Sequence, residues 1–293
     1  YRKTGYYDGV QILRMPTGST LLAAGDAPFA PFSVSRSKNF VDYSLQAQYF
    51  FTDNLQAYVS FATGSKGFGF QRAPTSGIPG NPTFFQDPYF RPEYSETFEA
   101  GVKWSLGYAG HLNVAFFRTH LKDFQTSYRL PSTVVVVRND QIRSQGVELS
   151  ADYEIFNGFR ASLTATYADV EKTVPVAGSI PSLILSPKWS GMGQLSYARD
   201  ISDDVGLSAD LSFEFRSRQY LNDSTAAALT SDPGRTRTDF RLAFEHHPSN
   251  VEVALIMQNV FNVHSISYSY ASPLGGAIVA DEMPRTTGAR PGL

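Results

Sequence analysis

The stretch GVELSADYEIFNGFRASLTATYADV, residues 146 to 170, alternates between apolar and polar side chains on both sides of a break at Asn157-Gly158. Asn-Gly is a typical two-residue hairpin turn, and a period of two places every second side chain on one face of a strand. The stretch therefore predicts a β-hairpin with one apolar and one polar face. A soluble sandwich and a membrane barrel can both contain such a hairpin, so the solvent at its apolar face has to be argued separately.

The same alternation recurs along most of the chain. The further stretches that show it are 43–51, 55–61, 98–106, 189–197, 205–215, 240–244 and 251–257. None of them keeps the 3.6-residue period of an amphipathic helix. The sequence therefore predicts an all-β chain of antiparallel strands.

The connections between these strands alternate in length. Short ones, TDN, GYAG, FNG, DISDD and HPSN, carry the Gly, Asn and Asp of tight turns. Long ones cover about residues 66–92, 127–139, 173–185, 220–234 and 263–279. If residues 5–14 and 282–290 are also strands, the chain has about twelve, the even number typical of outer-membrane barrels.

Composition excludes several classes of function. The 293 residues carry a net charge of -2 and no cysteine, so nucleic-acid binding, a disulfide framework and a thiolate metal site are not expected. The apolar runs are far shorter than the roughly 18 residues of a spanning helix, so a membrane location would require strands. The N-terminus has no signal-peptide core, and we expect the chain to be part of a longer protein.

The strand lengths and the loop asymmetry favour a transmembrane β-barrel. Its strands need about 9 to 11 residues, with short turns on one side and long loops on the other, whereas a propeller blade needs four strands per repeat. Charged residues lie at mid-strand on the polar faces, where a barrel would have a wet interior: Asp42, Glu99, Lys103, Glu148, Asp152, Glu154, Arg160, Asp210, Glu214 and Arg216. Aromatic residues recur near strand ends, as at membrane interfaces. The apolar faces are therefore predicted to meet lipid.

Five segments in order give the chain a family resemblance. They are LQAYVSFATGSKGFGFQRAP (55–74), RPEYSETFEAGVKW (91–104), RNDQIRSQGVELSADYEI (138–155), MQNVFN (257–262) and MPRTTGAR (283–290). Their order and spacing resemble the C-terminal half of the barrel of TonB-dependent outer-membrane receptors. The resemblance covers about residues 40 to 290.

The resemblance implies a barrel of about 22 strands occluded by an N-terminal plug. Such a receptor, in the bacterial outer membrane, binds a scarce ligand such as a ferric siderophore, cobalamin or a glycan, and the inner-membrane TonB complex drives its import. Neither the plug nor the TonB box lies in residues 1–293, so we expect one partial barrel domain with about the last twelve strands. Its last strand departs from the family, because Pro291, Gly292 and Leu293 replace the usual continuation to a terminal aromatic residue.

Ligand contacts are expected on the long loops and the upper lumen, because loops on a rigid scaffold commonly carry binding. Aromatic side chains mixed with cations suit planar or anionic ligands. The candidate residues are Lys66, Phe68, Phe70, Arg72, Tyr89, Arg91, Tyr128, Arg129, Arg218, Tyr220 and Tyr268.

Motifs for other chemistry are weak. His246-His247 precede a turn and point to opposite faces, so no metal site is expected. His264 near Ser265 and Ser267 lacks an oriented third partner, and the glycines of TGSKGFGF precede no helix. We expect no enzyme and no cofactor. The alternatives to a receptor are a self-contained twelve-stranded outer-membrane channel or lipase, and a soluble all-β binding protein.

Overall fold

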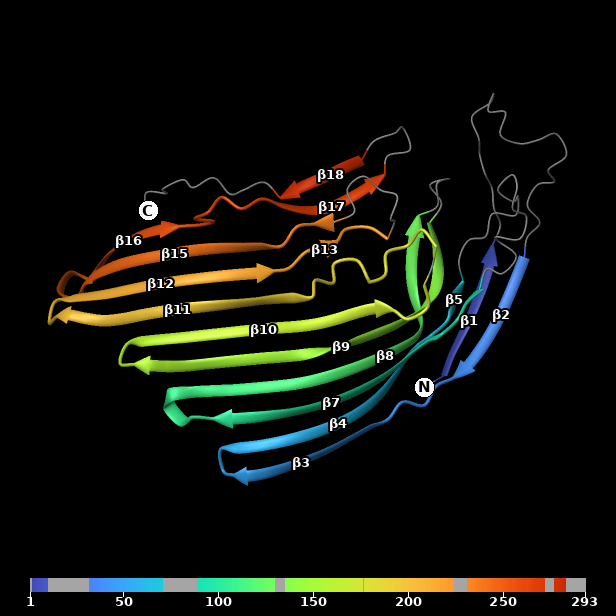
Figure 1. Cartoon of the computed structure of the whole chain (residues 1–293), viewed down its shortest axis with the longest axis horizontal. Helices are drawn as coiled ribbons and strands as arrows, with labels where there is room; N and C mark the ends of the chain where they lie inside the picture. The colour runs from blue at the N-terminus through green and yellow to red at the C-terminus, as the bar shows by residue number, and fades with distance from the viewer. Residues whose placement is uncertain are drawn as a thin grey trace. The chain divides into compact units, whose positions relative to one another are not determined.

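A computed structural model describes residues 2–9, 32–70, 89–129, 135–175, 177–223, 231–271 and 277–282. The described residues are almost all in strands, and their pairing is antiparallel throughout (Figure 1). This confirms the predicted all-β antiparallel fold. Among these residues, no helix is long and apolar enough to cross a membrane.

Ten strands form one sheet in the order β16-β15-β12-β11-β10-β9-β8-β7-β4-β3. Each strand pairs with its neighbours in the chain, as a meander of hairpins does. The bounds are β3 (Ser44–Thr52), β4 (Leu55–Lys66), β7 (Glu93–Ser105), β8 (Gly110–Arg129), β9 (Val135–Phe156), β10 (Phe159–Lys172), β11 (Trp189–Ser202), β12 (Val205–Arg216), β15 (Arg235–His246) and β16 (Val251–Met257).

Four two-stranded pairs accompany the large sheet. They are β1 (Arg2–Gly9) with β2 (Phe32–Asn39), β5 (Gly69–Phe70) with β6 (Tyr89–Phe90), β13 (Gln219–Tyr220) with β14 (Ser231–Asp232), and β17 (Ser265–Ala271) with β18 (Ala277–Glu282). The predicted first strand, 5–14, overlaps β1, and its residues 10–14 lie outside the described residues. Of the predicted last strand, 282–290, only Glu282 is described.

The chain falls into two compact units. Unit 1 consists of Tyr1–Tyr43, Thr63–Ser95 and Leu121–Gln141, and unit 2 of Ser44–Ala62, Glu96–His120 and Ile142–Leu293. The short turns all lie in unit 2, and two of them are the 3-10 turns η1 (Gly107–Ala109) and η2 (His247–Ser249). Asn157-Gly158 forms a turn as predicted, with Gly158 at φ 83°, a backbone conformation that glycine adopts without steric cost.

The strand register in unit 2 separates the apolar and the polar face. Leu163 lies opposite Ala151 and Gly193, whereas the next residue, Thr164, lies opposite Ser150 and Met192. The opening hairpin therefore has the two faces that its alternation predicts.

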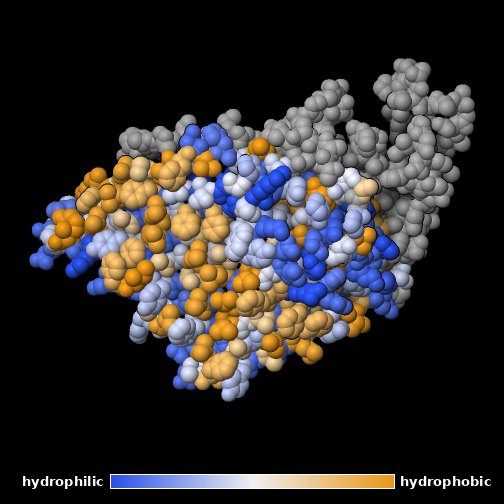
Figure 2. Space-filling model, in the orientation of Figure 1, coloured by the Kyte–Doolittle hydropathy of each residue, from blue (hydrophilic) through white to orange (hydrophobic). Residues whose placement is uncertain are grey.

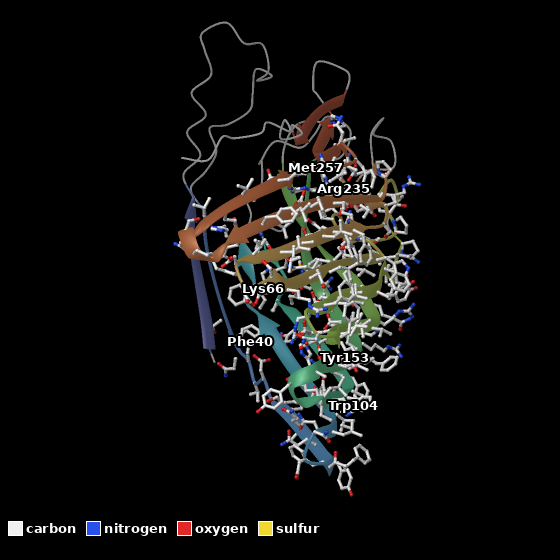
Figure 3. All side chains as sticks on the ribbon, turned by 90° about the vertical axis from the view of Figure 1, so that its left-hand side faces the viewer. Phe40, Lys66, Trp104, Tyr153, Arg235 and Met257 are labelled. Atoms are coloured by element: carbon white, nitrogen blue, oxygen red, sulfur yellow. The ribbon has the colours of Figure 1, made fainter. Side chains whose placement is uncertain are left out.

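The apolar face of unit 2 is turned outward rather than into a core. On interior strands of the sheet, Phe98 is 51% exposed, Trp104 42% and Ile155 53%, and Leu163 and Leu211 are only half-buried. Figure 2 shows hydrophobic residues gathered over the strands, and Figure 3, which faces the short turns, labels the outward residues Trp104 and Tyr153. A soluble sheet would bury this face against a second layer, so the exposure supports the predicted contact with lipid.

Candidate functional site

The ends of β4 and β7 meet in unit 1 and bring three predicted ligand residues together. Gln125 on β8 donates from Nε2 to the carbonyl oxygens of Gly67 and Arg91, each at 3.0 Å. Lys66 Nζ lies 3.6 Å from Glu93 Oε2, and the Lys66 side chain is 60% exposed. This part of unit 1 therefore presents a cation on a hydrogen-bonded framework.

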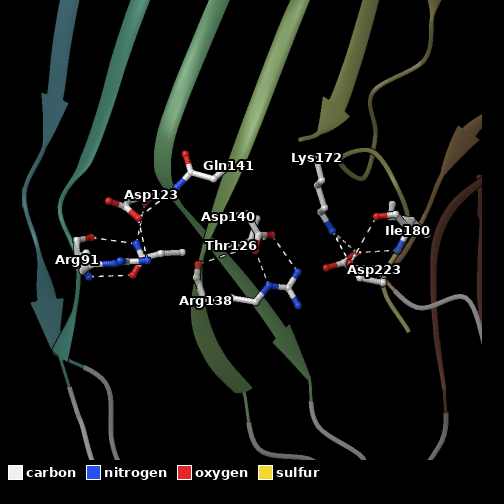
Figure 4. A network of polar contacts seen from close by, with 11 residues as sticks. Arg91, Asp123, Thr126, Arg138, Asp140, Gln141, Lys172, Ile180 and Asp223 are labelled. Carbon is white, nitrogen blue, oxygen red and sulfur yellow. Dashed lines mark hydrogen bonds and ion pairs between the residues drawn. The ribbon is translucent and has the colours of Figure 1, made fainter. Parts of the chain in front are cut away.

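Arg91 is the best-anchored of these residues. Its guanidinium lies 2.9 Å from Asp123 Oδ1, yet its side chain is 61% exposed. Asn139 donates from Nδ2 to the carbonyl oxygens of Arg91 (3.1 Å) and Asp123 (2.7 Å), and its Oδ1 accepts the Arg91 N–H at 2.9 Å. Figure 4 shows Arg91 beside Asp123. The cation is thus positioned by its backbone and one carboxylate and still faces solvent, where an anionic ligand can reach it.

Phe68 lies beside this framework but is buried, with 1% of its surface exposed. A ring in that position packs inside unit 1 and presents no face for stacking. Phe70, Tyr89, Tyr128 and Arg129 lie at the ends of β5, β6 and β8, and Tyr268 lies in β17. Arg72 lies outside the described residues.

A second group of predicted residues occurs in unit 2. Arg218 is exposed, donates from Nε to Ser231 Oγ at 3.0 Å, and lies 5.9 Å from the centre of the Tyr220 ring. Gln219, between them, pairs with Asp232 across β13 and β14. The short β13–β14 pair therefore holds an arginine and an aromatic ring next to each other, a pair that can bind a planar or anionic group.

Two paired carboxylates, the buried Asp140 and the half-buried Asp223, are site features that the sequence did not predict. Asp140 in unit 1 accepts hydrogen bonds from Arg138 Nη2 at 2.9 Å and Thr126 Oγ1 at 2.8 Å. In unit 2, Lys172 Nζ lies 2.6 Å from Asp223 Oδ1 (Figure 4). No local pattern marks the second pair, because its residues are far apart in the sequence.

The polar face of unit 2 carries paired charges. Arg160 pairs with Asp152 and Glu154, and Arg241 Nη2 lies 2.6 Å from Glu252 Oε1. A hollow of about 310 Å³ on the same part of the sheet is lined by Ser162, Thr164, Met192, Gly193, Gln194, Ser212, Phe213, Glu214, Arg237 and Asp239. This hydrogen-bonding surface is suited to water and polar groups.

No group of three or more metal-ligating side chains occurs among the described residues. His246 Nδ1 lies 2.7 Å from Ser249 Oγ, and His247 Nε2 lies 3.2 Å from Asp200 Oδ1. His246 thus has its partner within its own short turn, whereas the partner of His247 lies near the end of β11.

Comparison with known sequences gives one family. The profile described as "TonB dependent receptor-like, beta-barrel" matches residues 13–260. A sequence from Acinetobacter baumannii described as "Probable TonB-dependent siderophore receptor PiuA" is 28% identical over 146 residues, which are 49% of this chain and 19% of that protein.

Comparison with solved structures gives the same fold. The ferric yersiniabactin uptake receptor FyuA from Yersinia pestis has a TM-score of 0.67 at 20% identity, over 87% of this chain and 37% of its own. The ferric-catecholate import receptor Fiu from E. coli K12, in its closed form, has a TM-score of 0.62 at 18% identity, over 96% and 39%. The chain thus spans less than half the length of these relatives.

Proposed function

Because this chain belongs to the TonB-dependent receptor β-barrel family, we propose that it forms part of the barrel of an outer-membrane receptor that imports a ferric siderophore. The observation that carries this proposal is the arrangement of side chains on the sheet of unit 2. Its apolar residues face outward, and its paired charges lie on the opposite face. Such a sheet is stable where lipid covers one face and an aqueous lumen lies along the other.

In unit 1 the proposed ligand contacts are the exposed cations Lys66 and Arg91. In unit 2 they are, separately, the exposed Arg218 and the half-buried ring of Tyr220. Arginine binds carboxylate and other oxygen anions through paired hydrogen bonds, and it stacks on planar groups. Ferric chelates commonly combine these properties. The remaining candidates, Phe70, Arg72, Tyr89, Tyr128, Arg129 and Tyr268, belong to the same proposal, whereas the buried Phe68 would support the site from behind.

A siderophore is favoured over cobalamin or a glycan by the relatives. One is described as a probable siderophore receptor, and two others are described as a ferric yersiniabactin uptake receptor and a ferric-catecholate import receptor. In the proposed mechanism the barrel surrounds the transport path and supplies no energy for import. The TonB complex acts through an N-terminal plug of the whole receptor. The protein is thus a transporter and not an enzyme.

Growth under iron limitation tests the proposal. A strain that lacks the gene is supplied with ferric catecholate, ferric hydroxamate or ferric citrate as its sole iron source, in parallel with cobalamin and oligosaccharide growth assays. We expect the strain not to grow on one of the ferric complexes. Growth on that complex should return when the gene is restored and a TonB complex is present. Unchanged growth on every iron source, with lost growth on cobalamin or an oligosaccharide, would refute siderophore uptake.

A further inference from the structure

The last residue of β10 is a lysine whose charge is buried. The Lys172 side chain is 2% exposed, and its Nζ lies 2.6 Å from Asp223 Oδ1. A buried ammonium without a partner is strongly unfavourable, so the burial of Lys172 favours the conformation in which its charge meets the Asp223 carboxylate. Asp223 follows β13, so this pair joins the end of β10 to a segment that lies far from it in the sequence.

The same carboxylate oxygen also holds the connection between β10 and β11. Asp223 Oδ1 accepts a hydrogen bond from the Ser179 hydroxyl and another from the Ile180 N–H at 3.2 Å. Ile180 and Leu221 are buried, with 1% and 4% of their surfaces exposed. We call Lys172, Ser179, Ile180 and Asp223 the clasp.

Backbone hydrogen bonds extend the clasp in two directions. The connection folds back onto its own strand, where Lys172 N–H donates to Pro181 O at 2.7 Å and Ser182 Oγ donates to Val170 O at 2.7 Å. It also reaches the segment after β12, where Leu185 N–H donates to Tyr220 O at 2.8 Å. The backbone of one proposed ligand contact is therefore fixed by this connection.

We propose that Lys172 and Asp223 are positioning residues that preform one wall of the ligand site. The wall consists of residues 179–185 of the connection between β10 and β11 together with segment 217–223, which carries Arg218 and Tyr220. This inference rests on the proposed function, because it assigns the wall to ligand binding. A preformed wall binds without the entropy cost of ordering a loop, so the clasp acts on affinity and leaves the energised import step unchanged.

Hydrogen exchange of the purified whole receptor tests the wall without any ligand. In the native protein we expect slow exchange at the amides of Ile180 and Leu185, and at least about tenfold faster exchange in Lys172→Met, because local opening sets these rates. Lys188→Met is the matched control: Lys188 ends the same connection, but it is 63% exposed and pairs with Asp169 at 2.9 Å. Fast exchange at both amides in the native protein would overturn the inference, whatever the receptor transports.

Uptake kinetics separate positioning from a merely structural role. Uptake is measured with the ferric complex that supports growth, labelled with radioactive iron. We expect Lys172→Met to raise the KM of uptake about tenfold, with an unchanged Vmax per receptor in the membrane. Lys172→Arg should restore most of the affinity, and Lys188→Met should leave KM unchanged. A lower Vmax at the native KM would contradict the inference and leave siderophore uptake intact. If no ferric complex is taken up by the native receptor, the proposed function fails, and the exchange result still stands by itself.

Discussion

Arg91 illustrates how a single side chain can be both fixed and available. Asn139 and Asp123 hold its backbone and one edge of its guanidinium, while 61% of the side chain remains exposed. An exposed ion pair alone is worth about 0 to 1 kcal/mol, so this contact adds little to stability. Its value in the proposed receptor is that it orients a cation toward solvent.

Substitution of Arg91 therefore tests ligand binding more than folding. We expect Arg91→Met to lower the affinity for the transported ferric complex about tenfold, as the loss of one charge-assisted hydrogen bond of about 1.5 kcal/mol predicts. Arg118→Met, which removes an exposed arginine of β8 outside the proposed site, is the control. Equal affinities of both variants and the native receptor in a binding titration would remove Arg91 from the site.

Leu163 and Thr164 are neighbours on opposite faces of β10. We expect Leu163→Arg to lower the free energy of unfolding by about 2 to 4 kcal/mol, because it places a charge in hydrocarbon, and Thr164→Arg to be tolerated on the polar face. Urea unfolding in lipid vesicles measures both. If the two variants lose the same stability, the assignment of faces is wrong.

Local sequence predicted the face of each strand residue, but not the partners of the loop residues. Alternation alone assigns Leu163 and Thr164, because the pleat of a strand leaves no other choice. It does not distinguish a buried loop aromatic such as Phe68 from an exposed one. Nor could it predict the pair of Lys172 and Asp223, because the fold of two separate connections brings these charges together.

At the level of whole elements, β11 and β12 show how a glycine-containing strand is kept in register. Gly191 and Gly193 of β11 lie opposite Phe215 and Phe213 of β12. An added Cβ on Gly193 would lie 2.4 Å from Phe213 Cζ, so the ring occupies the space above the glycine. An aromatic ring over a cross-strand glycine restores the packing that the missing side chain would supply.

A double-mutant cycle tests the packing of the Phe213 ring over Gly193. We expect Gly193→Val to destabilise the barrel in the native background, because its side chain displaces the Phe213 ring, and to be nearly neutral in a Phe213→Ala background. The coupling should be about 1 kcal/mol, at the upper end for cross-strand pairs. Additive effects of the two changes in unfolding experiments would show that the ring does not cover the glycine.

The strands and short turns could be predicted from the sequence, whereas the extent of the loops could not. Turn residues such as Asn157-Gly158 determine a tight connection locally. The long connections were predicted as loops over 127–139 and 220–234, but β8 continues to Arg129, β9 begins at Val135, and β13 pairs with β14. Apolar and polar residues alternate poorly in these parts of the strands. The reason is that strand segments that extend beyond the membrane need no apolar face.

On the scale of the whole molecule, two aromatic pairs mark the edges of the apolar face. Each pair joins a residue of β10 to a residue of a neighbouring strand. Phe159 stacks on Phe156 with ring centres 5.0 Å apart, and Tyr167 lies 4.8 Å from Trp189. The rise from Phe159 to Tyr167 is about 26 Å along the strand at about 3.3 Å per residue. With a tilt of roughly 40°, this corresponds to about 20 Å of height, close to the apolar band of about 25 Å in such barrels.

Membrane extraction tests the size of this apolar face. We expect the receptor to remain in the membrane pellet after washes with alkaline carbonate and urea and to dissolve only with detergent, because the outward residues would otherwise meet water. A peripheral membrane protein serves as the control for the wash. Release of the receptor as a monomer in plain buffer would favour the soluble alternative.

The orientation of the two faces of β10 is tested most directly by fluorescence quenching from within the lipid. This chain has no cysteine, so a probe can be attached through Leu163→Cys or Thr164→Cys after any cysteine elsewhere in the receptor is replaced. In vesicles of lipids brominated along the acyl chains, we expect strong quenching of the probe at position 163 and little at 164. Equal quenching, or stronger quenching at 164, would contradict it.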